Sequence, residues 1–270
     1  MRKLSLYRAA VDGPVRRAAG RCGYNHPLLS ISVVIPAFNE ERRLPSSLDA
    51  VLSYLTEKRN EMTAEVLVVN DGSTDGTSAV TESFAGREIP VRLLNNPGNR
   101  GKGYSVRHGM LEAKGDWILF SDADLSAPIA ELDKLLAAAR NGDYQIVIGS
   151  RALDRSLIGV HQSMLREWAG RLFNLIMRAI IGLPFWDTQC GFKLYSGGAA
   201  REIFRRQRID GFGFDAEALF IGRKLGYRIL EVPVRWNHVE GTKVSMTRDS
   251  VRMFLDLART RWNQLRGLYR

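Results

Sequence analysis

Short apolar runs alternate with amphipathic stretches through the first half of the chain. Runs rich in Val, Ile and Leu, typical of buried strands, lie at residues 31–36, 65–69, 91–94, 117–120 and 144–148. Stretches with apolar residues at helical spacing lie between them, at residues 42–58, 74–84, 102–113 and 128–140. This alternation of strand and helix predicts an α/β fold, with a mostly parallel central sheet flanked by helices.

The second half is less regular. Residues 160–182 predict one or two helices with a wide apolar face, residues 214–225 a helix, and residues 227–236 an extended strand. Residues 247–265 predict a basic amphipathic helix. The residues that fall near one face of it are Val251, Phe254, Leu255, Ala258, Trp262 and Leu265. We find no repeat and no clear linker, so the simplest organisation is a single domain with amphipathic C-terminal helices.

Charge narrows the range of partners. The chain has 270 residues, a net charge of +10 and a pI of about 9.9, which favours an anionic partner such as nucleic acid, an acidic membrane or a phosphorylated substrate. The two cysteines, Cys22 and Cys190, lack metal-binding spacing and indicate a reducing compartment. No apolar stretch approaches the length of a membrane span, and the N-terminus lacks the apolar centre of a signal peptide.

An Asp-Ala-Asp run at 122–124 directly follows the strand predicted at 117–120. Residues i and i+2 of an extended chain point to the same side, so both carboxylates leave the end of the strand together. Open α/β sheets bind their ligands at that edge. A divalent metal that carries a diphosphate would use both charges. Taken alone, an Asp-x-Asp run is common and mostly forms a solvated turn, and only its neighbours favour a metal site.

Three further motifs follow predicted strands. Residues 36–41, Pro-Ala-Phe-Asn-Glu-Glu, would place a carboxylate over the sheet edge, or form a turn with an acid at a helix N-terminus. Residues 70–75 form an N-cap and turn cluster in which Asp71 could accept a hydrogen bond from a nucleobase. Residues 99–103, with their glycines and a lysine, favour an anion at a helix start and lack the spacing of a P-loop ATPase.

This combination resembles the inverting family 2 glycosyltransferases, which share a GT-A-type nucleotide-sugar-binding domain, and the resemblance is strong over residues 31–150. It implies that Glu40 and Asp71 contact the nucleoside, and that Asp122 and Asp124 address the diphosphate through Mg²⁺ or Mn²⁺. The nucleotide-sugar residues that it implies are Pro36, Ala37, Asn39, Glu40, Asp71, Gly101, Lys102, Asp122, Ala123 and Asp124.

Motifs in the second half narrow the resemblance to the dolichyl-phosphate glucosyltransferase and polyprenyl-phosphate glycosyltransferase group. They lie at residues 148–151, 187–194, 214–217, 234–236 and 240–243, and the Asp-Thr-Gln-Cys-Gly-Phe-Lys run is the most specific. The related mannose-phosphate-dolichol synthases usually have Ser-Gly-Phe-Arg in place of Cys-Gly-Phe-Lys, which favours glucose and UDP here. Those synthases carry a metal-binding Gln where this chain has Ser126, which puts metal ligation beyond Asp124 in doubt.

The resemblance implies transfer of a sugar to a lipid phosphate with inversion. We expect Arg151, Lys193 and Lys243 to hold the acceptor phosphate, and Asp187 to orient the sugar or an acceptor-binding side chain. The predicted catalytic residues are Asp122, Asp124, Asp187, Arg151 and Lys193. Structural alternatives are a surface ion pair for Arg151, a cap for Asp187, a solvated side chain for Lys193, helix N-terminal acids for Asp215 and Glu217, and a small buried residue for Cys190.

The predicted organisation is a basic segment at 1–30, a GT-A domain at 31–245 and a basic amphipathic helix at 246–270. Within that domain, residues 31–150 would bind the nucleotide sugar and residues 151–245 the acceptor. Residues 165–186 and 247–265 would either pack on the sheet or contact an anionic bilayer, on the cytoplasmic face of a membrane.

Three other functions compete with this prediction: a GDP-mannose-dependent mannosyltransferase acting on polyprenyl phosphate, a family 2 enzyme with a non-lipid acceptor, and a nucleotide- or nucleic-acid-binding protein without catalysis. We expect no nucleic-acid partner, because the sequence has no aromatic-basic platform and no helix-turn-helix pattern. The oligomeric state is open.

Overall fold

A computed structural model of the chain describes residues 28–160, 180–237 and 248–270. In the first half, strands and helices alternate as the sequence predicts. The strands are β1 (Leu29–Ala37), β2 (Met62–Asn70), β3 (Val91–Asn95), β4 (Trp117–Ser121) and β5 (Ile146–Ser150). The helices are α2 (Leu44–Glu57), α3 (Thr77–Ser83), α4 (Lys102–Glu112), the 3-10 turn η1 (Ile129–Glu131) and α5 (Leu132–Gly142).

The second half adds strands that run in both directions. Its elements are η2 (Arg155–Leu157), β6 (Ile158–Val160), β7 (Phe192–Ser196), α7 (Gly197–Arg206), α8 (Phe214–Lys224), β8 (Ile229–Pro233), β9 (Trp236–Asn237) and α9 (Arg248–Leu265). The predicted strand at 227–236 is divided, because β8 joins the main sheet whereas β9 pairs with β6. The sequence did not predict β7 or α7. The helix expected at 160–182 falls largely outside the described residues.

The main sheet has seven strands in the order β3-β2-β1-β4-β7-β5-β8. All neighbours are parallel except β7, which runs antiparallel to both β4 and β5. The start of β7 therefore lies beside the ends of β4 and β5: Phe192 pairs with Ser121, and Lys193 with Ile148. This register brings the loop before β7 to the edge where the predicted site residues lie.

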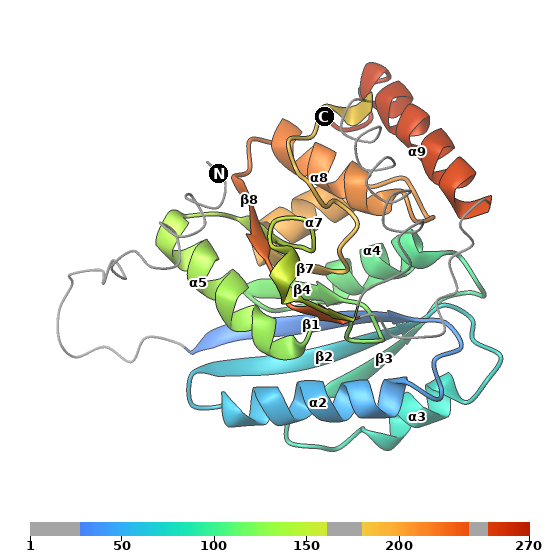
Figure 1. Cartoon of the computed structure of the whole chain (residues 1–270). Helices are drawn as coiled ribbons and strands as arrows, with labels where there is room; N and C mark the ends of the chain where they lie inside the picture. Colours follow the sequence, from blue (N-terminus) through green and yellow to red (C-terminus); the bar gives the residue numbers. More distant parts are fainter. Residues whose placement is uncertain (1–27, 161–179, 238–247) are drawn as a thin grey trace.

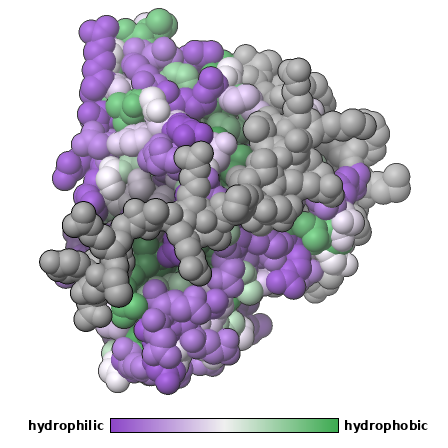
Figure 2. Space-filling view, turned by 90° about the vertical axis from the view of Figure 1, so that its left-hand side faces the viewer, coloured by the Kyte–Doolittle hydropathy of each residue, from purple (hydrophilic) through white to green (hydrophobic). Residues whose placement is uncertain are grey.

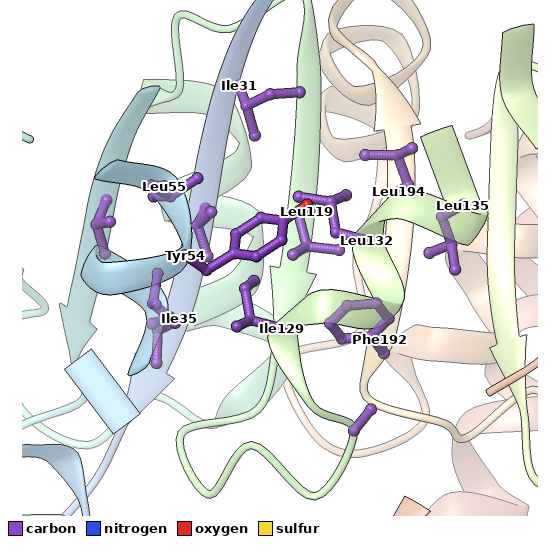
Figure 3. Packing of buried hydrophobic residues seen from close by; sticks show 14 of the residues in the cluster. Ile31, Ile35, Tyr54, Leu55, Leu119, Ile129, Leu132, Leu135, Phe192 and Leu194 are labelled. Carbon is purple, nitrogen blue, oxygen red and sulfur yellow. The ribbon is translucent and has the colours of Figure 1, made fainter. Parts of the chain in front are cut away.

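Helices cover both faces of the sheet (Figure 1). Helices α2, α3 and α5 enclose one buried cluster, in which Tyr54, Leu119 and Leu132 pack together between α2, β4 and α5 (Figure 3). The Tyr54 hydroxyl also donates to Asp133 at 2.9 Å, which ties α2 to α5. Helices α4, α7, α8 and α9 enclose a second cluster on the opposite face. The mostly parallel sheet between two helical layers confirms the predicted fold class.

Hydrophilic side chains predominate among the described residues visible on one face of the molecule (Figure 2). In the described part of the chain, every helix is too short or too polar to span a bilayer.

Candidate active site

A pocket of about 380 Å³ lies over the ends of β1, β2 and β4 and the start of α4. Its lining residues are Pro36, Ala37, Phe38, Glu40, Arg43, Asp71, Asn99, Gly101, Lys102, Ser105, Asp122, Ala123, Asp124 and Phe212. The structure thus brings together nine of the ten residues predicted to bind the nucleotide sugar. Asn39 is the exception, since its side-chain oxygen accepts a hydrogen bond from the Thr74 backbone at 2.8 Å and joins two loops.

Five of the lining residues were not predicted from the sequence: Phe38, Arg43, Asn99, Ser105 and Phe212. Phe212 comes from the loop before α8, which packs closely on the glycine-rich start of α4. A Cβ on Gly101 would lie 2.5 Å from the Asp210 carbonyl oxygen, and a Cβ on Gly103 would lie 2.4 Å from that of Ile209. The two glycines indicated that another part of the chain packs closely on the start of α4. Their spacing could not indicate that this part is the loop before α8.

Asp122 is paired with a lysine inside the pocket. The Lys102 ammonium lies 2.7 Å from Asp122 Oδ1. Within the described residues, Asp122 Oδ1 accepts no other hydrogen bond, so its partner is the positive charge of Lys102. Burial lowers the pKa of Lys102, but Asp122 and Asp215 outweigh burial and hold that pKa above its ordinary value. The lysine is therefore charged and acts as a counter-ion.

The backbone places Asp122 and Asp124 at the pocket. Asp122 N–H donates to the Gly191 carbonyl at 3.0 Å, and the Asp122 carboxylate rests on Gly191, where a Cβ would lie 1.9 Å from Oδ2. Asp124 Oδ1 accepts a hydrogen bond from the Ser126 backbone at 3.0 Å. Asp122 therefore fits only against a residue without a side chain.

These acids fit a divalent cation. Asp122 and Asp124 both line one pocket, and Asp122 already has a positively charged neighbour, the Lys102 ammonium. Oxygen ligands are those that Mg²⁺ prefers, and it usually binds through one or two carboxylates together with phosphate oxygens. No group of three His, Cys, Asp or Glu side chains able to hold a metal was found in the described part of the chain. A cation here would therefore need further ligands from a bound diphosphate or water.

Asp71 shapes the glycine-rich loop. Its carboxylate accepts hydrogen bonds from the backbone of Arg100 at 2.9 Å and of Gly101 at 2.8 Å, and from the Asn96 amide at 2.8 Å. Gly72 beside it has a φ of +71°, and a Cβ there would lie 2.5 Å from the Gly98 backbone. These bonds fix the pocket wall that precedes α4. Contact between Asp71 and a nucleobase stays a prediction.

Glu40, which follows β1, also lines the pocket. Its two carboxylate oxygens accept from Arg43 Nη2 at 2.7 Å and Nε at 2.8 Å. Arg43 also lines the pocket, and the charges of Asp124 and Asp122 contribute to its environment. The guanidinium is thus oriented by Glu40 close to the paired acids.

Arg151 and Asp187 form a bidentate ion pair beside this pocket. Arg151 Nε and Nη2 donate to the two Asp187 oxygens at 2.7 and 2.8 Å, and the Arg151 backbone adds a bond of 3.0 Å. Burial raises the pKa of Asp187, but Arg151 outweighs burial and holds it below its ordinary value. The Arg151 guanidinium also lies 5.5 Å from the centre of the Trp236 ring. Both groups are therefore charged, and the plane of the guanidinium is fixed.

Glu231 supports this pair, although sequence analysis did not identify it. Its buried carboxylate accepts hydrogen bonds from the backbone of Trp186 at 2.9 Å and of Asp187 at 2.7 Å. Glu231 lies on β8, next to β5 in the sheet. It thus joins the sheet to the loop that carries Asp187. An acid inside an otherwise apolar strand is a weak indication of a buried role, because its charge needs a buried partner.

Lys193 is fully buried, on β7. Its ammonium donates to Asp215 Oδ1 and to the Cys190 carbonyl, each at 2.5 Å. Burial raises the pKa of Asp215, and the ammonium groups of Lys193 and Lys102 offset only part of that effect. The ammonium groups of Lys102 and Lys193 each lie 5.5 Å from the centre of the Phe120 ring. Lys193 thus sits beneath the site in an internal ion pair, and direct contact with an acceptor stays a prediction.

Cys190 and Lys243 complete the set of predicted residues. Cys190 is buried, and burial, with the charge of Asp187, raises the pKa of its thiol to about 12. That environment fits a small packed residue. Lys243, the third predicted phosphate ligand, lies outside the described residues.

A family model identifies the family of this chain. The model described as "Glycosyl transferase family 2" matches residues 32–204, which include the pocket acids, the glycine-rich loop and the Arg151–Asp187 pair. The chain belongs to glycosyl transferase family 2. It is therefore an enzyme, a glycosyltransferase.

Curated relatives of this family 2 chain have related names. "Dolichyl-phosphate beta-glucosyltransferase ALG5D" of Trichomonas vaginalis is 33% identical, over 96% of this chain and 81% of the relative. The dolichyl-phosphate beta-glucosyltransferase of Drosophila melanogaster is 38% identical, over 81% of this chain and 70% of the relative. That of Saccharomyces cerevisiae is 34% identical, over 89% and 76%.

Solved structures share the fold of the family 2 chain. Glucosyl-3-phosphoglycerate synthase from Mycobacterium tuberculosis, crystallised with UDP, has a TM-score of 0.62 at 19% identity, and the match covers 94% of this chain and 82% of that one. A second crystal structure of that synthase holds Mn²⁺, UDP and glucosyl-3-phosphoglycerate, and matches with the same TM-score of 0.62 and identity of 19%. The likeness establishes the GT-A-like architecture.

Proposed function

We propose that this enzyme transfers glucose from UDP-glucose to a polyprenyl or dolichyl phosphate and forms a β-linked lipid-phosphate sugar. The observation that carries the proposal is the meeting of two sites at Gly191. On one side Asp122 rests on this glycine, and on the other the same loop carries Asp187, which binds Arg151. A pair of acids suited to a metal-bound diphosphate thus lies next to an oriented cation suited to an acceptor phosphate.

Electrostatics supports the closeness of the two parts. Burial lowers the pKa of Arg151 and Asp187 raises it, and the charge of Asp122 adds to the rise, so the pKa lies above its ordinary value. Arg151 is therefore within electrostatic reach of the acid that we assign to the donor. The names of the curated relatives support the sugar and the acceptor, since all three reported above are dolichyl-phosphate beta-glucosyltransferases. The UDP in a solved structure of the same fold supports the nucleotide.

The acceptor needs orientation more than deprotonation. The second pKa of a phosphate monoester is about 6, so the nucleophilic oxygen is already ionised at neutral pH. Arg151 would hold that phosphate, and Asp187 would keep the guanidinium in place. The phosphate oxygen then forms a bond to the anomeric carbon as the bond to the diphosphate oxygen breaks on the opposite side. An α-linked donor gives a β-linked product.

The diphosphate that leaves carries negative charge away from the sugar. Asp122 and Asp124 would hold Mg²⁺ or Mn²⁺, which supplies Lewis-acid stabilisation of that charge when bound. Lys102 stands next to Asp122 and would add a second positive charge on the same oxygens. Glu40, Arg43 and Asp71 would bound the nucleoside part of the pocket. Lys193 would act through Asp215 and the Cys190 carbonyl by fixing the loop that carries Asp187.

The first experiment is a transfer assay with purified enzyme, Mn²⁺ and a matrix of substrates. UDP-glucose, UDP-galactose and GDP-mannose are each combined with a polyprenyl phosphate, a soluble sugar and 3-phosphoglycerate. We expect UDP-glucose and the lipid phosphate to react best, and Asp124→Ala to abolish the reaction. Preferred use of GDP-mannose would identify a mannosyltransferase. Transfer to a soluble acceptor alone would reject the lipid acceptor.

A lipid acceptor places the enzyme at a membrane. We infer peripheral attachment on the cytoplasmic face, because the described helices do not span a bilayer and the two cysteines indicate a reducing compartment. Fractionation followed by a high-salt wash tests attachment, and protease treatment of sealed vesicles tests the side. Protection of the enzyme from protease in sealed vesicles whose cytoplasmic face points outward would contradict this orientation.

A further inference from the structure

Helix α9 exposes an unbroken apolar stripe. Val251, Leu255, Trp262 and Leu265 are 60%, 58%, 62% and 80% exposed, and Ala258 between them is exposed as well. Their positions follow the spacing i, i+4, i+7, i+11 and i+14, which puts all five on one face of a helix. We call these five residues the α9 stripe. An amphipathic helix of a soluble domain normally turns such a face toward the core.

The opposite face of α9 is already packed, so the stripe cannot turn inward. Met253, Leu257 and Thr260 are buried against the domain. The helix lies against α8 at the periphery of the molecule, as Figure 1 shows. After the helix, the chain returns so that Tyr269 is buried and its hydroxyl donates to Glu217 on α8. The orientation of the stripe toward solvent is therefore fixed by the fold.

Arginines border the stripe. Arg252, Arg259 and Arg266 follow Val251, Ala258 and Leu265 directly in the sequence, and all three are exposed. Arginine beside apolar and Trp side chains is the composition of helices that lie in the interface of an anionic bilayer. A second copy of this chain fits less well, since each copy carries a net charge of +10 and would bring its own arginines to the contact.

The buried face of α9 leads to the donor pocket. Glu217, which holds Tyr269, also accepts from the backbone of Arg208 and Ile209, and this segment continues to Phe212 in the pocket lining. A Cβ on the next residue, Gly213, would lie 2.5 Å from the Cβ of Asp256 on α9. A surface bound by the stripe would thus be held in a set orientation to the pocket.

We propose that the α9 stripe is the surface by which this enzyme docks on an anionic phospholipid bilayer, with Trp262 and Leu265 inserted and the arginines at the headgroups. The proposal deepens the proposed function and rests on it for the lipid acceptor, but vesicle binding can be measured without turnover. Bound in this way, the helix would hold the donor pocket at one height and angle above the membrane.

The test is flotation of the full chain with vesicles of phosphatidylcholine, with or without 30% phosphatidylglycerol, at low and high salt. We expect binding to the anionic vesicles, weakened by salt. Trp262→Glu with Leu265→Glu should lower partitioning by roughly tenfold or more, because two apolar anchors become charged. Arg252→Glu with Arg266→Glu should lower it similarly and remove most of the salt dependence.

Matched controls carry the same changes elsewhere on the surface. Leu111→Glu alters an exposed leucine on α4, and Arg140→Glu alters an exposed arginine at the end of α5. Both should bind vesicles as the unchanged protein does. All variants should keep the unfolding temperature and the affinity for UDP with Mn²⁺, because the stripe touches neither the core nor the pocket.

The outcomes separate this inference from the proposed function. Equal loss of binding in the control variants, or no binding to anionic vesicles at low salt, would overturn docking by α9. A dimer in solution that Trp262→Glu dissociates would assign the stripe to a second copy instead. A short, water-soluble isoprenyl phosphate serves as acceptor in parallel: turnover of it without vesicle binding would reject the docking surface and leave the transferase intact. Vesicle binding without turnover of any lipid phosphate would support the docking surface and reject the proposed lipid acceptor.

Discussion

The ammonium of Lys102 lies 2.7 Å from Oδ1 of Asp122, one of the two acids that would hold a divalent cation. Asp122 is therefore already in an ion pair with Lys102 before any ligand binds. This ion pair also puts the lysine and a cation in competition for the same oxygen.

Replacing Lys102 tests this competition. In Lys102→Met, Mn²⁺ should bind the nucleotide-free enzyme more tightly, roughly tenfold, because a positive charge beside Asp122 is removed. UDP should bind more weakly, since the diphosphate loses a cationic neighbour. Titration followed by the EPR signal of free Mn²⁺ measures the first effect, and calorimetry the second. Lys58→Met, which removes a surface lysine 3.4 Å from Asp133, is the control. Unchanged or weaker Mn²⁺ binding in Lys102→Met would refute the competition.

Gly191 should tolerate no side chain. In Gly191→Ala, the new Cβ would lie 1.9 Å from Asp122 Oδ2, so the carboxylate must move. We expect loss of Mn²⁺-dependent UDP binding and of transfer, with the far-UV circular dichroism spectrum retained. Gly198→Ala is the matched control, because a Cβ there meets nothing within 4 Å. Normal UDP affinity in Gly191→Ala would show that the position of Asp122 does not matter.

The Asp187 carboxylate should matter through Arg151. Asp187→Asn keeps the size of the side chain but removes the charge that holds the guanidinium, and a misplaced catalytic group costs roughly a hundredfold in rate. The KM for the acceptor should rise more than the KM for the donor. Asp143→Asn, which alters an exposed ion pair with Arg228 at 3.8 Å, should change neither. An equal rise in both KM values would argue for a purely structural role of Asp187.

The tail that follows α9 should stabilise the domain. Tyr269→Phe removes the hydroxyl that donates to the buried Glu217. Glu217 keeps its backbone donors from Arg208 and Ile209, but the loss of one hydrogen bond to a buried carboxylate should cost about 1–3 kcal/mol, so chemical denaturation should show a lower free energy of unfolding. Tyr144→Phe, on a partly buried ring at the other side of the sheet, serves for comparison. Equal stability of Tyr269→Phe and the unchanged protein would remove this anchor.

Cys190 should be inert. Its thiol has a pKa of about 12 against an ordinary value of 9.0, because burial disfavours the thiolate. In a Cys22→Ser background, iodoacetamide at pH 9 should label the folded protein roughly a hundredfold more slowly than the unfolded one. Since the folded pKa is raised, the thiol's contribution to stability is complete below pH 9 and declines as the pH rises toward 12. Rapid labelling of the folded protein at pH 9 would contradict this environment.

The sequence predicted the parallel half well because each strand there is a short, mainly apolar run, separated from the next by a stretch with helical spacing. The acids at 122–124 and the glycine-rich loop could be placed at one edge because parallel strands end on the same side. Nothing local indicated β7 and α7. The run at 192–196 has a lysine at its second position, and α7 begins with two glycines, which are poor helix formers.

Lys193 shows why the second half was harder. The resemblance of its motif to the family placed this lysine at the acceptor phosphate, which stays a prediction. The structure adds an ion pair between its ammonium and Asp215, 22 residues farther along the chain. The pairing depends on β7 and α8 meeting behind Phe120, which no spacing in the sequence encodes. The same holds for Glu231, whose partners are backbone groups of a loop 44 and 45 residues earlier.

The reversed direction of β7 places the loop before this strand, and not the loop after it, at the edge of the sheet that carries the pocket. A strand that runs with its neighbours delivers its following loop to the ligand edge, whereas β7 delivers the loop that precedes it. A change in the loop that precedes Gly191 would therefore leave β7 and its pairing with β4 and β5 in register. One chain reversal would thus let acceptor preference diverge among descendants of this fold without disturbing the nucleotide pocket.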